Sequence, residues 1–150
     1  KLSAVLGSGD ITKGKELLKV FFVRFPFLKE FRKRLDTEVR RGYTRGLDGR
    51  LIGLNKEMPH LAMSVVLQSF ESIVIKTAMC LYHEELRKLG VWFKQRLIVH
   101  DEYLTETKKD LAQEVGKQIV KGIEEAGAQL ASKCPLTGQF AIGTSWAAVH

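Results

Sequence analysis

The sequence predicts an α+β protein that is mostly helical and carries a small antiparallel sheet. Three observations support this fold class: two helical segments that each begin at a proline, an Asp-Gly pair between β-prone runs, and two β-rich segments on either side of a polar tip. With 150 residues, 45% of them hydrophobic, the chain can bury one sizeable core but not two independent ones. We expect a single compact unit over residues 1–150, basic over 1–60 and charge-balanced over 61–150.

The first elements are helical. Residues 2–6 form an apolar run without a helix cap or a signal-peptide layout, which predicts a helix entered midway, and residues 7–10, Gly-Ser-Gly-Asp, interrupt it. Thr12 can cap a short helix through about Phe22. From Pro26 to Arg41, apolar residues recur at helical spacing among Lys and Arg, so this helix is amphipathic and basic.

The middle of the chain predicts a hairpin followed by a long helix. Asp48 and Gly49 lie between the β-prone runs 43–47 and 50–52, which is a strong local signal for a hairpin. Pro59 can then begin a helix that Gly90 ends, about 30 residues or some 45 Å long. This helix is apolar on most sides, so we expect a buried central strut.

The last third predicts a second hairpin, a covering helix and a short tail. Residues 91–107 contain β-rich segments on either side of His100 and Asp101, which indicates two strands that meet at a polar tip. Apolar residues at helical spacing between Leu111 and Leu130 predict an amphipathic helix that covers the sheet. Residues 135–150 are expected to add one final strand.

Charge is the first pointer to a partner. Residues 1–60 hold 14 Lys and Arg against 7 Asp and Glu, whereas residues 61–150 hold 10 of each, so the net charge of +7 comes from the first 60 residues. Such a concentration suits a phosphate backbone, although a solvated basic face with no partner is an equally good interpretation of charge alone.

Two further features bear on the cellular setting. The apolar stretch 61–81 is interrupted by polar and charged residues, so the sequence predicts no membrane span. Cys80 and Cys134 lack metal-ligand spacing and have apolar neighbours, which favours two buried thiols in a reducing cytoplasm over a disulfide framework.

A row of polar residues marks the predicted long helix. His60, Ser64, Gln68 and Glu71 recur at intervals of four, four and three, which places them on one face of an otherwise apolar helix. An internal hydrogen-bond network would explain the row. Beside the basic first third, the row could instead meet base edges or sugars, because a glutamine amide both donates and accepts.

The polar tip is the second candidate site. His100, Asp101 and Glu102 directly follow the apolar residues 97–99, which would place a carboxylate at the mouth of a packed sheet, where a divalent cation could hold it ionised. One aspartate cannot build a two-metal site, since the two cations need a second acidic residue from elsewhere. Ordinary hairpin-tip residues remain the simpler interpretation of the tripeptide taken alone.

Four segments of the sequence are informative when they are considered together. Residues 42–50 read Gly-Tyr-Thr-Arg-Gly-Leu-Asp-Gly-Arg, residues 59–69 begin Pro-His and end Leu-Gln-Ser, residues 99–102 read Val-His-Asp-Glu, and residues 143–150 fit Gly-x-x-Trp-x-x-x-His. In this order and spacing they resemble motifs of family A DNA polymerases, the DNA polymerase I type, and most closely its bacteriophage replicative branch. Residues 99–102 resemble motif C of that family. The resemblance covers nearly all of the chain.

The resemblance implies a fold and a catalytic site. The chain would be the C-terminal fingers and palm portion, with a small antiparallel palm sheet carrying motif C. Asp101 would be one of two aspartates that bind catalytic Mg²⁺, with Glu102 as its acidic neighbour and His100 near the primer terminus. The second aspartate would come from a missing part.

The resemblance also implies DNA contacts. Gln68 would contact the minor groove at the nascent base pair, where acceptors occupy similar positions in all correct pairs. His60 would lie near the template strand and Arg50 near backbone phosphate. Ser64 stands at a template-contacting position where asparagine is common. Leu2 and Leu6 stand where the family usually carries aromatic residues, since residues 7–10 resemble the phage Gly-Ala-Gly-Asp.

The expected function is therefore template-directed DNA synthesis from primer-template DNA and dNTP. The first metal-binding motif and the Lys and Arg of the fingers helix that hold the triphosphate are absent from these 150 residues. An N-terminal polymerase part or partner chain would complete the site, in the cytoplasm of a bacterial or phage-infected cell. The alternative from another class is a non-catalytic DNA-binding or scaffold piece that retains the fold.

Overall fold

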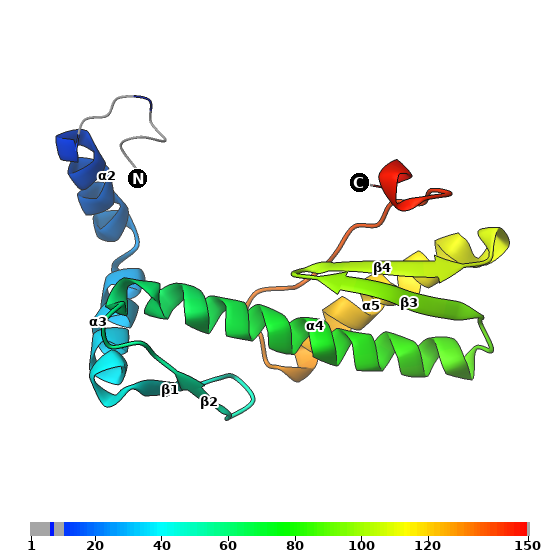
Figure 1. Cartoon of the computed structure of the whole chain (residues 1–150), viewed down its shortest axis with the longest axis horizontal. Coiled ribbons are helices and arrows are strands. Elements are labelled where there is room, and N and C mark those ends of the chain that lie inside the picture. The colour runs from blue at the N-terminus through cyan, green and yellow to red at the C-terminus, as the bar shows by residue number, and fades with distance from the viewer. Residues whose placement is uncertain (1–6, 8–10, 150) are drawn as a thin grey trace. The chain divides into compact units, whose positions relative to one another are not determined.

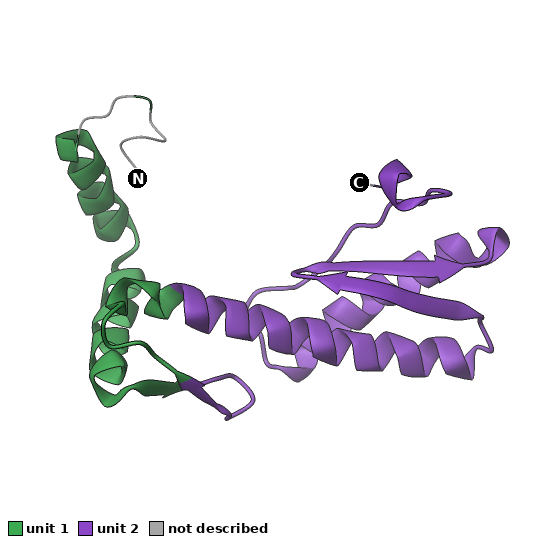
Figure 2. Ribbon diagram, viewed as in Figure 1, with its two compact units in different colours: residues 1–44, 53–63 green, residues 45–52, 64–150 purple. Residues whose placement is uncertain are grey.

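The computed structural model describes Gly7 and residues 11–149 (Figure 1). The chain divides into two compact units, residues 1–44 with 53–63 and residues 45–52 with 64–150 (Figure 2). We call these the first and the second unit and describe each by itself. The helix expected over residues 2–6, with Leu2 and Leu6, lies outside the described residues.

Two helices make up most of the first unit. α2 spans Ile11–Arg24 and α3 spans Pro26–Arg41, which confirms both predicted helices. Thr12 lies inside α2 rather than capping it, because the helix already includes the preceding residue. α3 begins with its proline at the first helical position and ends at Gly42, whose φ of 92° only glycine adopts readily.

Apolar side chains in the first unit remain uncovered. α3 buries Leu35 and Val39, as its apolar spacing predicts. α2 buries only Gly14. The large apolar residues exposed on α2 and at the start of α3 are Ile11, Leu17, Leu18, Val20, Phe21, Val23, Phe25 and Phe27. Much of the hydrophobic surface of this unit is therefore available to a partner.

The Asp-Gly hairpin forms as predicted. β1 (Tyr43–Arg45) pairs with β2 (Leu51–Gly53) in a two-stranded sheet. Gly49 has φ +81°, and its N–H donates to the carbonyl of Gly46 over 3.0 Å. Gly49 therefore supplies the left-handed backbone conformation that the hairpin turn needs.

The long helix forms with its predicted ends. A 3₁₀ turn, η1 (Pro59–Leu61), leads into α4 (Ala62–Lys88). Gly90 has φ +64°, and the N–H groups of Gly90 and Val91 donate to the carbonyls of Arg87 and Leu86, which ends the helix.

By length and composition alone, Pro59–Lys88 could cross a membrane, and it is the one such helix among the described residues. The core helix of a soluble protein passes the same test. Ala78, Tyr82 and Leu86 are at most 1% exposed because other elements pack on them. Only 22% of the most apolar window is buried, so α4 contributes to the core on one side and leaves apolar surface uncovered, whereas the sequence predicted a buried central strut.

The second unit packs a hairpin and a helix on α4. β3 (Phe93–Val99) pairs antiparallel with β4 (Glu102–Thr107), and η2 (Lys109–Leu111) leads into α5 (Ala112–Gln129), as expected for the covering helix (Figure 1). One core cluster joins Val74 and Ala78 of α4 to Ala126 of α5. A second cluster joins Tyr82 and Leu86 to Val115.

Helices α4 and α5 approach closely at a glycine. A Cβ on Gly122 would lie 3.0 Å from the carbonyl oxygen of Ala78 and 3.1 Å from the Cβ of Tyr82. Neither atom is the end of a flexible side chain, so any larger residue would force the helices apart.

The tail corrects one expectation. Residues 130–149 contain no strand, and their last regular element is a 3₁₀ turn, η3 (Trp146–Ala148). The tail lies against α5, with Leu136 beside Gly127 and Phe140 beside Gly116. A helix has no free backbone groups to pair with a strand, which is why the predicted final strand does not form.

The two cysteines correct another expectation from the sequence. Both thiols are free and both residues are exposed, whereas the sequence predicted them buried. Cys80 faces away from the α4 surface that carries Ala78 and Tyr82, and Cys134 lies in the connection that follows α5. Apolar neighbours in the sequence did not indicate which side of a helix is covered.

Candidate active-site hairpin and DNA-facing residues

His100 and Asp101 form a two-residue loop at the tip of the β3–β4 hairpin. Val99 and Glu102 are paired on either side of them. His100 has a φ of +54°, which is uncommon for a residue other than glycine. It occupies the first loop position, where two-residue hairpins favour positive φ. Asp101 is exposed. The loop therefore presents a carboxylate to solvent from a tightly defined turn.

A β-bulge lies four residues before the tip. Gln95 pairs with Thr105 and Leu97 with Leu104, which leaves Arg96 as the extra residue. The Gln95 amide donates to the Leu104 carbonyl over 3.1 Å, and its oxygen accepts from the Thr105 hydroxyl over 3.1 Å. Arg96 forms an ion pair with Glu106 across the strands. These bonds hold the bulge in one register, and the tip with it.

Two tyrosines fasten the hairpin to α4. The Tyr103 hydroxyl donates to the backbone carbonyl of Ile75, and the Tyr82 hydroxyl donates to the Gln95 side-chain oxygen. Burial raises the pKa of both hydroxyls above the ordinary value, so both stay protonated as donors. Their rings meet edge to face with centroids 5.4 Å apart. The position of Asp101 thus depends on α4 through Tyr103, one residue beyond Glu102.

Sequence reasoning missed these supporting residues. Gln95 is a polar residue at a half-buried strand position, and Tyr103 directly follows the polar tripeptide. Both features are visible in the sequence, but neither identifies the group to which the side chain forms its hydrogen bond. The partners, an α4 carbonyl and a tyrosine 13 positions earlier, are separated in sequence and meet only in the fold.

The strand before the tip differs from expectation. Leu97, Ile98 and Val99 were expected to be packed, yet they are 41%, 41% and 46% exposed. Successive strand residues point to opposite faces of a sheet, so Leu97 and Val99 on one face and Ile98 on the other show that both faces of β3 are uncovered beside the tip. The tip is therefore at the edge of an open apolar surface and not at the mouth of a packed sheet.

The residues of the tip do not by themselves make up a metal site. The part of the chain that the structure describes holds no group of three or more His, Cys, Asp or Glu arranged to bind a metal ion. Asp101 and Glu102 are adjacent and exposed, and carboxylate oxygens are suitable ligands for Mg²⁺. These residues fit a contribution to a magnesium site whose other protein ligands come from elsewhere.

The polar row of α4 faces outward. In the second unit, Ser64 and Gln68 are exposed and Glu71 is half-buried. Neither the Ser64 side chain nor the Gln68 side chain forms a hydrogen bond with another described residue, so the alternative of an internal network does not form there. In the first unit, His60 is exposed within η1. The exposed amide of Gln68 is available to an external partner.

Arg50 is oriented by its own hairpin. Its Nε is 2.5 Å from Oδ2 of Asp48, and its backbone N–H donates to Oδ1 over 3.2 Å. Desolvation opposes ionisation of Asp48, but the backbone and side-chain hydrogen bonds from Arg50 outweigh it and hold the pKa of that carboxyl below its usual value. The two Nη groups of Arg50 remain available for a phosphate.

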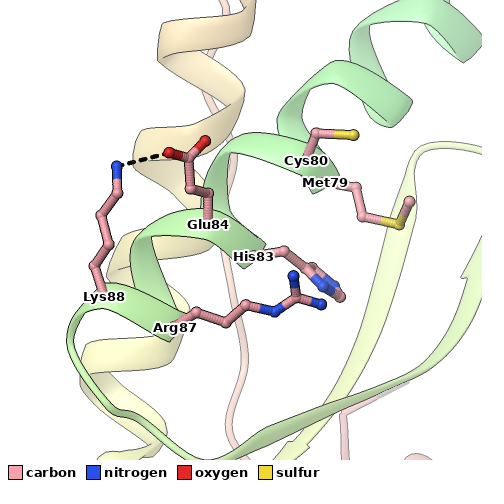
Figure 3. Close-up of a pocket in the computed structure, with 6 residues that line it drawn as sticks. All are labelled: Met79, Cys80, His83, Glu84, Arg87 and Lys88. Atoms are coloured by element: carbon pink, nitrogen blue, oxygen red, sulfur yellow. Dashed lines mark ion pairs between the residues drawn. The ribbon is translucent and has the colours of Figure 1, made fainter.

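A separate open pocket lies on α4, with residues Met79, Cys80, His83, Glu84, Arg87 and Lys88 around it (Figure 3). Lys88 pairs with Glu84 over 2.8 Å. The Nε2 atom of His83 is buried without a partner among the described residues. Burial, and then the charge of Arg87, lower the pKa of this imidazole. None of these residues belongs to the four motifs.

The model of DNA polymerase family A matches residues 1–148. This chain belongs to DNA polymerase family A. It is 26% identical to a DNA-directed DNA polymerase of Escherichia phage Phieco32 over 155 aligned positions, which cover 100% of this chain and 25% of that protein. It is 28% identical to DNA polymerase I of Aquifex aeolicus (strain VF5), over 95% of this chain and 26% of that protein.

A solved structure supports the fold. The POL domain of Pol1 from M. smegmatis, in complex with DNA primer-template and dNTP, is similar in structure, with a TM-score of 0.72 and 22% sequence identity. The match covers 83% of this chain and 24% of the Pol1 chain. The family A chain therefore has the α+β fold of a polymerase fingers and palm portion, with its two small antiparallel sheets. It spans about a quarter of the length of the relatives it matches.

Proposed function

We propose that this chain takes part in template-directed DNA synthesis as the C-terminal fingers and palm portion of a family A DNA polymerase. The observation that carries the proposal is the exposed Asp101 on the β3–β4 tip, in a chain matched to the family over residues 1–148. The enzyme would be a DNA-directed DNA polymerase that is active only when an N-terminal part or partner chain completes it.

Asp101 is the proposed metal ligand, with Glu102 as a second carboxylate beside it and His100 near the primer terminus. When bound, two Mg²⁺ ions would stabilise the attacking and leaving oxygens of the transferred phosphoryl group. The role of this chain is to hold the Asp101 carboxylate in place. The bulge at Gln95 and the bond from Tyr103 to α4 provide that rigidity.

The proposed DNA contacts lie on exposed parts of the chain. Gln68 would donate to minor-groove acceptors of the nascent pair, and Ser64 would contact the template from the same helix. Arg50, oriented by Asp48, would bind a backbone phosphate. His60 would lie near the template strand. These roles make primer-template DNA and dNTP the partners of the completed enzyme, in the cytoplasm of a bacterial or phage-infected cell.

Two observations support the need for a completing part. The described residues hold no full set of metal ligands. Leu97, Ile98 and Val99 leave apolar strand surface exposed directly before the tip, and such surface is normally covered in a working protein. A segment that covers β3 could also bring the second metal-binding aspartate to Asp101.

Asp101→Asn in the completed polymerase tests the proposal. We expect primer extension to fall by at least about a thousandfold, while the affinity for primer-template DNA changes little because it depends on backbone contacts. The measurement is single-nucleotide incorporation with magnesium, alongside DNA binding without dNTP.

Asp110→Asn is the matched control, since Asp110 is also an exposed carboxylate but lies in η2, away from the motif. It should extend primers at the parent rate. If Asp101→Asn retains extension within about tenfold, which is only about 1.4 kcal/mol of barrier, the metal role is wrong. The non-catalytic DNA-binding or scaffold alternative would then be preferred.

A further inference from the structure

The side-chain amide of Gln95 uses its whole hydrogen-bonding capacity. Its oxygen accepts from the hydroxyls of Tyr82 and Thr105. Its NH₂ group donates to the backbone carbonyls of Leu97 and Leu104. A glutamine amide offers two donor hydrogens and two oxygen lone pairs, so four bonds to three elements, α4, β3 and β4, satisfy all of it. A half-buried amide paired in this way has one defined orientation.

This amide lies at the bulge between β3 and β4. Leu97 and Leu104 are the first pair after the extra residue Arg96, and the NH₂ group of Gln95 bonds to both of their carbonyls. A bulge interrupts the ladder of backbone hydrogen bonds between two strands. The side chain therefore bridges the strands at the point where the ladder is broken. We call the Gln95 amide and the two hydroxyls that donate to it the bulge clamp.

The bulge decides which way the end of β3 faces. Successive strand residues alternate between the two faces of a sheet. Thr105 and Tyr103 lie two positions apart on β4 and therefore on one face. Their partners Gln95 and Ile98 share that face although they are three positions apart, because the extra residue shifts the alternation by one. The tip loop continues directly from this strand, so the direction of its carboxylate depends on the bulge.

We propose that Tyr82 is a positioning residue for the carboxylate of Asp101 and acts through the bulge clamp. The inference rests on the proposed function and deepens it, because it assigns control of that carboxylate to a hydroxyl of α4 outside the four motifs. The Tyr82 hydroxyl holds the Gln95 oxygen toward α4, which leaves the NH₂ group facing the strands. If the amide turned over, its oxygen would meet two carbonyl oxygens and the bridge across the bulge would be lost.

Tyr82 is well placed to hold the clamp still. Its side chain is 1% exposed and packs with Leu86 and Val115 in a core cluster. Its ring also meets the rings of Phe93 and Tyr103 edge to face. Because the ring is held from several sides, its hydroxyl gives β3 one position relative to α4. A catalytic group that is misplaced by about 1 Å can lose up to about a hundredfold in rate.

Three single substitutions test the inference. Tyr82→Phe and Thr105→Val each remove one hydroxyl of the bulge clamp. Thr107→Val is the matched control, because the Thr107 hydroxyl donates to the Trp92 carbonyl over 2.7 Å at the other end of the same hairpin. Thr105 and Thr107 are both half-buried on β4 and lie two positions apart.

The first measurement needs neither metal nor activity. Amide hydrogen exchange of residues 97–104 is compared with that of α5 in the 150-residue chain, which separates local opening of the hairpin from global unfolding. We expect Tyr82→Phe and Thr105→Val to speed exchange over residues 97–104 by at least about fivefold relative to α5, as the loss of one neutral hydrogen bond allows. Thr107→Val should leave this ratio at the parent value.

The second measurement is single-turnover nucleotide incorporation by the completed polymerase at saturating magnesium. We expect the rate constant to fall at least about fivefold in Tyr82→Phe and Thr105→Val, because the carboxylate of Asp101 is held less firmly. The amplitude and the KM for dNTP should stay at the parent values. A merely structural role would lower the amplitude, which counts folded enzyme, and leave the rate constant unchanged. Thr107→Val should match the parent in all three quantities.

Unchanged exchange over residues 97–104 in both clamp variants would overturn the proposal, and so would a smaller fall in their rate constants. An equal fall in Thr107→Val would also overturn it, since the place of the lost hydroxyl would then not matter. If Tyr82→Phe does not fold, Thr105→Val decides. Failure of the proposed function shows separately, as retained extension by Asp101→Asn. Where that variant is inactive and the clamp variants keep the parent rate, only the positioning inference fails.

Discussion

At the scale of single residues, Gln68 offers the sharpest distinction between a structural and a DNA-binding role. A buried glutamine with satisfied partners would cost about 1–3 kcal/mol of stability when replaced by alanine. Gln68 is exposed, and its side-chain amide forms no hydrogen bond with another described residue. Its replacement should therefore leave the fold almost unchanged.

We expect Gln68→Ala to shift the melting temperature of the completed polymerase by less than about 2 °C, since little is buried. Single-nucleotide incorporation should fall, because a donor to the minor groove is lost. Primers that lack the purine N3 acceptor at their terminus should lower incorporation by the parent but have little further effect on the variant. An early-melting variant that responds to the modified primer as the parent does would assign Gln68 to the core.

His100 illustrates a different residue-scale constraint. It adopts φ +54° at the hairpin tip, where a side chain costs free energy unless the surrounding structure enforces it. The enforcement comes from the pairs on either side and from the Gln95 bonds at the bulge. Strain held at the residue before Asp101 is consistent with a functional loop.

At the scale of elements, the tail and α5 fit together through small residues. A Cβ on Gly116 would lie 2.4 Å from a ring carbon of Phe140. Real Cβ atoms do not come so close, so a larger residue must displace the ring and the tail segment that carries it. The opposing effect is helix propensity, which favours alanine over glycine by about 1 kcal/mol.

We expect Gly116→Ala to lower the free energy of unfolding by about 1–2 kcal/mol, since overpacking costs more than the helix gains. In a Phe140→Ala background the same change should instead be neutral or stabilising, because the clashing ring is gone. Urea unfolding of the four proteins of this cycle measures the coupling. If the cost of Gly116→Ala were the same in both backgrounds, Phe140 would not be its cause.

At the scale of the whole molecule, family membership and the small share of the relatives that this chain spans lead to the same expectation. The chain spans about a quarter of its relatives and holds no full set of metal ligands among its described residues. It also leaves apolar surface uncovered on α2, on α4 and beside the β3–β4 tip.

The 150-residue chain alone should therefore give no magnesium-dependent primer extension above the buffer blank. Addition of an N-terminal polymerase part should restore it, because that part would bring the second aspartate and the triphosphate-binding cations. The measurement is a primer-extension assay on the purified chain with and without that part. Extension by the chain alone would show that it needs no completing part.

The sequence alone determined most of the elements of this protein. Helix α3 begins at Pro26, and the η1 turn that leads into α4 begins at Pro59. Gly42 and Gly90 follow the ends of the two helices, and the Asp-Gly turn forms where it was predicted, because these signals act within a few residues of the chain. The motif order predicted the family for the same reason, since motifs are local strings.

Only the tertiary structure decided which surfaces are covered. The burial of Cys80 and of residues 97–99 was predicted wrongly because it depends on elements far along the chain, and the tail lost its predicted strand to a helix it could not pair with. The bonds from Tyr82 and Tyr103 that hold the Asp101 tip also span long sequence separations. Local pattern fixes where a helix or turn forms, whereas packing fixes what each side chain meets.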